Sequence, residues 1–173
     1  MQRPSPAPIQ APVSMLEKTP GLLELLLRDV SAEVLQWKPA ADRWSITEVL
    51  AHLLMIEQLY EQRARRIVIE ESPALPRYAP PAESEVPKKP ARQYLEELVA
   101  LRRAFVFFLH AVPSAAGART GIHPEMGTIT LSQMLHELAN HDLGHIRQVA
   151  ELYRAYCFYP HAGPFRKYSQ PKP

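Results

Sequence analysis

Two histidines and an aspartate stand close together in the last third of the chain. His141 and His145 are four residues apart, with Asp142 between them. If this segment is helical, the two imidazoles stack on one face and come near enough to bind one ion. Neutral imidazoles suit a metal of borderline softness such as zinc or nickel, and a firm site needs at least one more protein ligand. The spacing therefore predicts part of a metal site.

His52 is the best candidate for the third ligand. It lies in a separate apolar stretch, at the border of the apolar face, where it can face a neighbouring helix. The other histidines are less well placed. His110 and His123 flank a predicted loop, and His161 lies near the end of the chain.

Two carboxylates also interrupt apolar faces. On a helical wheel, Asp142 and Glu57 both project inward. They need partners, because an unpaired buried polar group costs roughly 1–3 kcal/mol. One interpretation is that each orients a ligand imidazole or acts as an acid or base. For Glu57 the alternative is a buried ion pair with an arginine, and the candidates are Arg102, Arg103 and Arg147.

The prolines mark the segments that carry these groups. The chain of 173 residues has 18 Pro and only 6 Gly, and proline is excluded from helix interiors and central strands. Three long proline-free windows, 40–72, 91–112 and 125–159, are rich in good helix formers. A shorter helix is predicted from Pro20, with Thr19 as its N-cap. Ser45 and Glu48 form a capping box at the start of the second helix.

Four amphipathic helices are most simply buried as an antiparallel four-helix bundle, so the predicted fold is all-α. No strand-like alternation bounded by turns is visible. The connection over 72–90, between the second and third helices, holds six prolines and predicts a long crossover. The predicted limits are a disordered arm over 1–13, the bundle over 14–159 and an irregular tail over 160–173.

Composition argues against several classes of protein. Apolar residues make up 46%, charged residues 22%, and the net charge is +2, which fits a globular chain and not a nucleic-acid binder. The single cysteine, Cys157, excludes an internal disulfide and a cysteine-based zinc site, and favours a reducing compartment. No apolar run approaches the ~20 residues that span a bilayer, and residues 1–12 lack the apolar region of a signal peptide. We expect a cytoplasmic protein with no membrane partner.

Two segments, in this order, resemble the DinB-like family, also called the DinB/YfiT-like metalloenzymes, which are bacterial four-helix bundles. The first is RWSITEVLAHL over 43–53, with Glu57 shortly after it. The second is HELANHDLGHIRQ over 136–148. With LQWKP at 35–39 they extend from the end of the first helix to the last, whereas the 72–90 connection and the tail show no resemblance.

The resemblance implies a divalent metal, commonly nickel or zinc, held by three histidines that match His52, His141 and His145. It also implies a homodimer. Characterised members of the family include transferases and isomerases that use low-molecular-weight thiols such as bacillithiol or mycothiol. The leading hypothesis is therefore metal-dependent transfer of a small thiol to a small electrophile.

Three other functions remain open. The HDLGH segment has the spacing of the zinc-protease helix, with Asp142 where glutamate serves as general base, which would fit a metal-dependent hydrolase. A bundle that holds a metal or small ligand for stability, storage or sensing would not be an enzyme. The histidines could also form a buried hydrogen-bond network without a metal.

Overall fold

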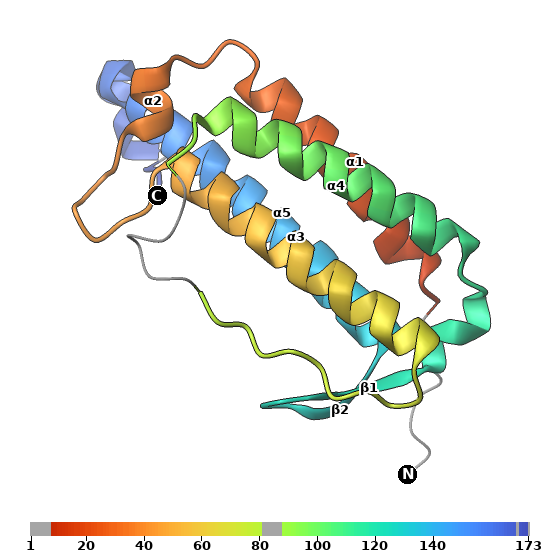
Figure 1. Ribbon diagram of the computed structural model, residues 1–173. Coiled ribbons are helices and arrows are strands. Elements are labelled where there is room, and N and C mark those ends of the chain that lie inside the picture. Colours follow the sequence, from red (N-terminus) through yellow and green to blue (C-terminus); the bar gives the residue numbers. More distant parts are fainter. Residues whose placement is uncertain (1–7, 81–87, 169, 173) are drawn as a thin grey trace.

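The computed structural model describes residues 8–80, 88–168 and 170–172 of the chain. Four long helices form a bundle (Figure 1), which confirms the predicted fold class. The α1 and α3 helices do not neighbour each other, and each packs against both α4 and α5. The bounds of the four helices are Gln10–Leu27 for α1, Ile46–Ile69 for α3, Ala91–Ala111 for α4 and Leu131–Cys157 for α5.

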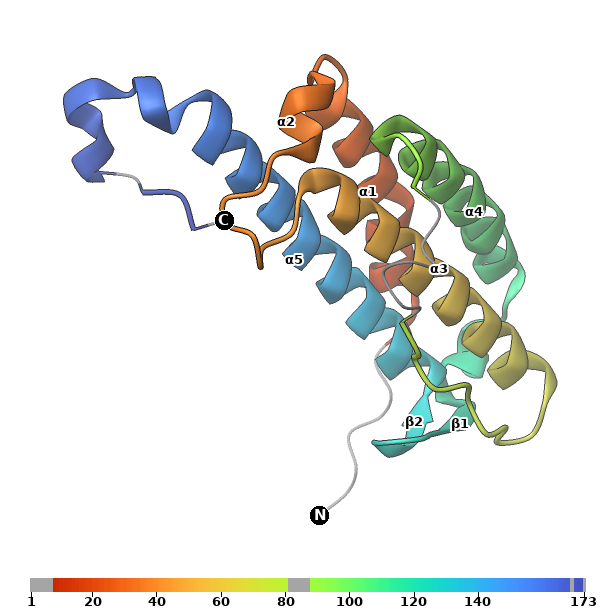
Figure 2. The same ribbon diagram turned by 60° about the vertical axis from the view of Figure 1, so that its left-hand side comes forward.

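The direction of the helices differs from a simple up-and-down bundle. Figures 1 and 2 show that α1 and α5 run one way along the bundle and α3 and α4 run the other way. The α1–α4 and α3–α5 neighbours are therefore antiparallel, whereas α3 and α4 are parallel. A parallel pair requires the chain to return along the bundle between them, and residues 70–80 begin this return. Residues 81–87 of the predicted proline-rich connection lie outside the described residues.

The first helix begins earlier than predicted. The α1 helix starts at Gln10 and continues through Pro20, so Thr19 is not its N-cap. Pro12 falls in the first turn, where a backbone N–H has no partner within the helix, and it therefore fits there. Because Pro12 and Val13 are buried, the bundle includes residues that we predicted to belong to the arm over 1–13. Residues 1–7 of that arm lie outside the described part of the chain.

Both helices that carry the predicted ligands begin at capping boxes. The Ser45 hydroxyl oxygen accepts from the Glu48 amide at 3.2 Å, and the Glu48 carboxylate accepts from the Ser45 amide at 2.7 Å. Thr130 and Gln133 repeat this arrangement at the start of α5, at 3.1 and 2.9 Å. The caps fix where each helix begins, and so which face of it carries the histidines.

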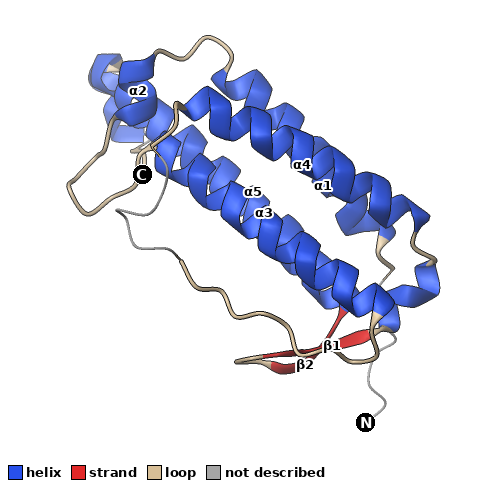
Figure 3. Ribbon diagram, in the orientation of Figure 1, coloured by secondary structure: helices blue, strands red, loops and turns tan. Residues whose placement is uncertain are grey.

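A short β-hairpin, which was not predicted, lies at the end of the bundle where α3 ends and α5 begins (Figure 3). Strand β1 (Thr120–His123) pairs with β2 (Gly127–Thr130) in antiparallel register. Each strand has four residues, too few for a recognisable apolar–polar alternation. At the turn, Gly127 has a φ of +71°, which favours glycine. Ala74 of the connection bridges to Ile122 and ties the connection to the hairpin.

The remaining elements are short. Helix α2 (Ala32–Gln36) precedes α3, and the 3₁₀ turn η2 (Ser114–Ala118) precedes the hairpin. The tail over 160–173, predicted as irregular, contains the 3₁₀ turns η3 (Tyr159–His161) and η4 (Gly163–Tyr168), neither of which buries a residue. Residues 169 and 173 lie outside the described part. Within the described ranges, no helix combines the length and apolarity that a membrane span requires.

The apolar core has two parts, which follow each other along the bundle. One part, nearer the hairpin, includes Phe105 and Leu135, and the other includes Leu50 and Leu152. Between them along each long helix lies one buried polar residue. These residues are Thr19, Glu57, Arg102 and Asp142.

Candidate metal centre

The three predicted ligands come together between α3 and α5. His52 comes from α3, and His141 and His145 come from α5. One ring nitrogen from each lies within 4.8 Å of the others, and the Nε2 atoms of His52 and His141 are 3.1 Å apart. Two nitrogens bound tetrahedrally to one ion at 2.0–2.1 Å would lie roughly 3.3 Å apart. The arrangement therefore fits three imidazoles around one ion.

Two of the rings are oriented through their other nitrogen. The Nδ1 atom of His145 lies 2.8 Å from the Gln148 side-chain oxygen. The Nδ1 atom of His52 lies 3.3 Å from the Tyr78 hydroxyl. Such contacts are typical of metal-binding histidines, because they fix the ring and leave Nε2 for the ion. The Nδ1 atom of His141 is buried and has no hydrogen-bond partner among the described residues.

The imidazoles of His52 and His141 are poised to be neutral. Burial and the neighbouring His145 and His141 rings lower the pKa of His52 to about 4. Burial and His145 also lower the pKa of His141. A metal ion binds the unprotonated ring, so low pKa values keep these nitrogens available near pH 7.

Two aromatic side chains border the histidines. The Trp44 ring lies nearly parallel to that of His145, with centroids 6.1 Å apart and an interplanar angle of 10°. It also lies 5.0 Å from the His52 ring. Tyr78 approaches His52 from the proline-rich connection, so the described part of that segment borders the site. In the sequence, Trp44 was noted only as part of the RWSITEVLAHL segment, and no signal indicated a tyrosine in a loop.

A pocket of about 1030 Å³ opens beside His141 and His145. Polar side chains dominate its lining, including Arg43, Glu137 and Gln148. Sequence reasoning missed Glu137, although it stands one helical turn before His141 and faces the same pocket. A second pocket of about 1050 Å³, lined by α2 and the first residues of α3 and α4, contains none of the three histidines. We therefore associate the chemistry with the first pocket.

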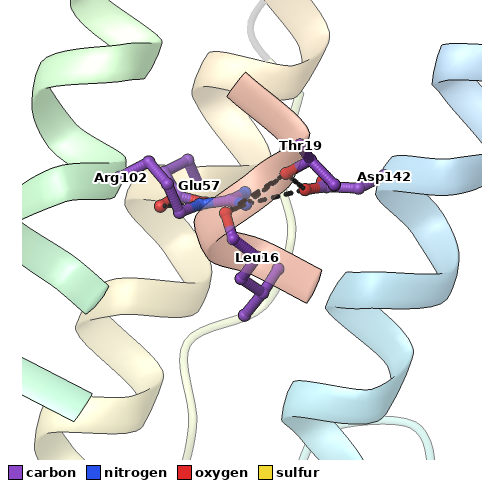
Figure 4. Close-up of polar contacts among 5 residues, drawn as sticks. All are labelled: Leu16, Thr19, Glu57, Arg102 and Asp142. Carbon is purple, nitrogen blue, oxygen red and sulfur yellow. Dashed lines mark hydrogen bonds and ion pairs between the residues drawn. The ribbon is translucent and has the colours of Figure 1, made fainter. Parts of the chain in front are cut away.

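The two predicted carboxylates lie elsewhere. Glu57 and Asp142 point to the bundle axis, where both contact Arg102 (Figure 4), at 2.6 and 2.7 Å. Of the two interpretations of Glu57, the structure therefore shows the buried ion pair, and its partner is Arg102. Within the described residues neither carboxylate hydrogen-bonds to a histidine, so neither orients a ligand imidazole directly. The helical wheel correctly placed both carboxylates on the inner faces of their helices. They point to the bundle axis, whereas the histidines lie along the edge where α3 and α5 meet.

Burial and charge act in opposite directions on this ion pair. Burial raises the pKa of Glu57, and the hydrogen bonds and charge of Arg102 oppose that rise. Burial alone would lower the pKa of Arg102, but the two carboxylates raise it above its ordinary value. Arg102 therefore carries a firm positive charge in the core.

Comparisons with known proteins show the family and a similar fold. A sequence model of the DinB superfamily matches residues 15–149. The uncharacterized protein YuaE from Bacillus subtilis (strain 168) is 26% identical over 143 residues, covering 73% of this chain and 87% of YuaE. The structure of YfiT from Bacillus subtilis, described as a probable metal-dependent hydrolase with an unusual four-helix bundle topology, is similar with a TM-score of 0.78 and 23% identity. That match covers 89% of this chain and 91% of YfiT. From residue 15 to residue 149, the chain belongs to the DinB superfamily.

Proposed function

We propose that the protein is a divalent-metal-dependent enzyme that acts on a small molecule, with His52, His141 and His145 as the metal ligands. The observation that carries this proposal is the convergence of three ring nitrogens within 4.8 Å beside an open pocket. Three protein ligands leave at least one coordination position for a substrate or water, as in catalytic rather than structural sites. Nickel and zinc are the ions that best suit this donor set.

A divalent ion at this position would lower the pKa of a bound water toward 7 or bind a thiol as its thiolate. The chain's own residues prepare the site. Gln148 and Tyr78 hold two of the rings, and Trp44 covers one side of them. The adjoining pocket has room for a small molecule.

Our first candidate reaction is transfer of a low-molecular-weight thiol to a small electrophile. The family resemblance of the two histidine segments supports it. The thiol would have to be a substrate, because the single cysteine, Cys157, lies 12 residues after His145, about 18 Å along α5.

The second candidate is hydrolysis, and two observations favour it. YfiT, which shares the fold, is described as a probable metal-dependent hydrolase. Glu137 lines the pocket beside His141 and His145, where its carboxylate could act as a general base. Asp142, which the zinc-protease spacing suggested for that role, is directed into the core instead.

One experiment separates these candidates. Protein made without a histidine tag would be loaded with Zn²⁺ or Ni²⁺ and assayed on two panels. One panel pairs small thiols with a chromogenic electrophile, and the other contains esters and amides without thiol. Thiol transfer predicts turnover in the first panel alone, and hydrolysis predicts thiol-independent turnover that Glu137→Gln reduces.

In either case chelation and His145→Ala should abolish turnover. His136→Ala is the matched control, because His136 lies on the same helix but bonds to the Ser132 carbonyl at 2.8 Å, outside the cluster. Loaded protein that turns over neither panel would contradict the enzymatic proposal and favour a non-catalytic metal-binding bundle.

A further inference from the structure

A layer of buried polar side chains crosses the centre of the bundle (Figure 4). It contains Thr19 of α1, Glu57 of α3, Arg102 of α4 and Asp142 of α5, each at most 5% exposed. Every long helix thus contributes one residue. The two parts of the apolar core lie on either side of the layer.

Arg102 is the centre of this layer, because all three nitrogens of its guanidinium donate hydrogen bonds. Nε and Nη2 donate to the two carboxylate oxygens of Glu57, both at 2.6 Å. Nη1 lies 2.7 Å from Oδ2 of Asp142 and 2.9 Å from the Thr19 hydroxyl. The paired bonds to Glu57 have the fork geometry that fixes orientation as well as distance. From α4, Arg102 therefore holds α3 and α5 at once.

The same arginine also compensates for a proline. Pro20 has no backbone N–H, so the carbonyl of Leu16, four residues earlier, lacks its usual helical donor. Nη1 of Arg102 donates to that carbonyl at 3.0 Å, and α1 continues through Pro20. The buried Leu16 carbonyl is thus a further fixed point for the guanidinium.

The layer is close to the histidines along both ligand-bearing helices. Asp142 directly follows His141, and Glu57 lies five residues after His52, about 7.5 Å along the axis of α3. Sliding α3 against α5 would separate the Nε2 atoms of His52 and His141, which are 3.1 Å apart. A functional site needs its groups held to within about 0.5 Å. Stability alone explains such a layer poorly, because well-packed apolar residues often stabilise a core as well as a buried ion pair does.

We infer that Arg102 is a positioning residue for the metal centre. Through Glu57 and Asp142 it sets the register of α3 against α5 that brings His52 to the two histidines of α5. This inference rests on the proposed function, since it requires that the histidines bind a metal. Arg102 acts through the helices, because its guanidinium hydrogen-bonds to Glu57, Asp142, Thr19 and the Leu16 carbonyl, and to no histidine among the described residues.

The test uses Co²⁺ as the probe, because its visible absorption reports coordination geometry. Arg102→Lys keeps the positive charge and loses the fork, whereas Glu57→Gln keeps the shape and loses the negative charge. Both variants should bind Co²⁺ about 10- to 100-fold more weakly, with an altered visible spectrum. Leu109→Ala is the matched control. It removes a 2% exposed side chain two turns further along α4, and should lower the denaturation midpoint without changing Co²⁺ affinity or spectrum.

The Co²⁺ measurements can overturn the inference in two ways. Wild-type Co²⁺ affinity and spectrum in both variants, with lowered midpoints, would assign the layer to stability only and overturn the inference. An equal loss of affinity in Leu109→Ala would also overturn it, because any destabilisation would then weaken the site. If Arg102→Lys does not fold, Glu57→Gln decides by the same criterion. A wild-type chain that binds no Co²⁺ contradicts the proposed function itself, and the inference with it.

Discussion

The three histidines differ in what holds their second ring nitrogen. Gln148 holds His145 and Tyr78 holds His52, whereas Nδ1 of His141 is buried without a hydrogen-bond partner in the described part of the chain. A ring that is held by a neighbour does not need to be ordered when the ion binds. We therefore expect the side chains around the histidines to contribute to affinity.

Gln148 gives the clearest prediction at this scale. Replacing it with leucine should lower metal affinity about 10- to 100-fold, because the His145 ring loses the oxygen that orients it. A chelator-competition titration measures this change, with circular dichroism to confirm the fold. An affinity equal to that of the wild type would show that His145 is oriented by packing against Trp44 instead.

The low pKa of His52 predicts how the metal-free protein responds to acid. Unfolding returns this pKa from about 4 to the ordinary value of 6.5, so in that interval the unfolded chain binds a proton that the folded chain does not. The contribution of His52 to stability is complete above pH 6.5 and is lost as the pH falls toward 4. Urea unfolding at pH 7, 5 and 4 should show a larger loss for the wild type than for His52→Gln. Equal losses would contradict this account.

The residue types predicted which histidines come together but not their surroundings. Helical spacing indicated His141 and His145, and a position at the border of an apolar face indicated His52. A helical wheel gives the direction of Glu57 and Asp142 but not which neighbour they meet, so their contact with Arg102 was one of several alternatives. Tyr78 could not be predicted, because its place beside His52 depends on the path of a long loop.

At the scale of elements, prolines located three of the four long helices. The prolines did not locate α1 correctly. A rule based on sequence alone treats Pro20 as a helix boundary, and it takes no account of a hydrogen-bond donor that another helix supplies. Arg102 supplies that donor at the Leu16 carbonyl. The hairpin was missed for a related reason, since its short strands are stabilised by the bundle end and by the bridge from Ala74.

Two glycines allow the attachment of the hairpin to be tested. A Cβ at Gly121 in β1 would lie 2.9 Å from the Leu75 side chain and 3.0 Å from that of Ile67, so Gly121→Ala should destabilise the protein by about 1–3 kcal/mol. A Cβ at Gly144, within α5, would meet nothing within 4 Å. Gly144→Ala should therefore stabilise the protein by about 0.5–1 kcal/mol. Chemical denaturation of both variants checks the two signs, and the same sign in both would contradict the packing described for β1.

At the scale of the whole molecule, the bundle places its polar layer between two apolar regions. The histidines lie next to this layer along α3 and α5. The apolar regions can hold the four helices together without a metal. An ion bound by the histidines would then add stability to a fold that already exists, in contrast to small domains that fold only around their metal.

This arrangement predicts stabilisation by metal. At a free ion concentration one hundred times the dissociation constant, the folded state should gain about 2.7 kcal/mol. The melting temperature should rise with Zn²⁺ or Ni²⁺ in the wild type and in His136→Ala, and stay constant in His145→Ala. A rise of equal size in His145→Ala would indicate that the ion binds elsewhere.

The metal content of the protein shows whether the three histidines bind an ion. Protein produced without a histidine tag, dialysed to remove loosely bound ions and examined by elemental analysis, should contain about one divalent ion per chain. His52→Ala, His141→Ala and His145→Ala should each contain far less. A wild-type chain without a stoichiometric ion, even after incubation with Zn²⁺ or Ni²⁺, or an unchanged ion content in the three variants, would contradict the assignment of these histidines as a metal centre.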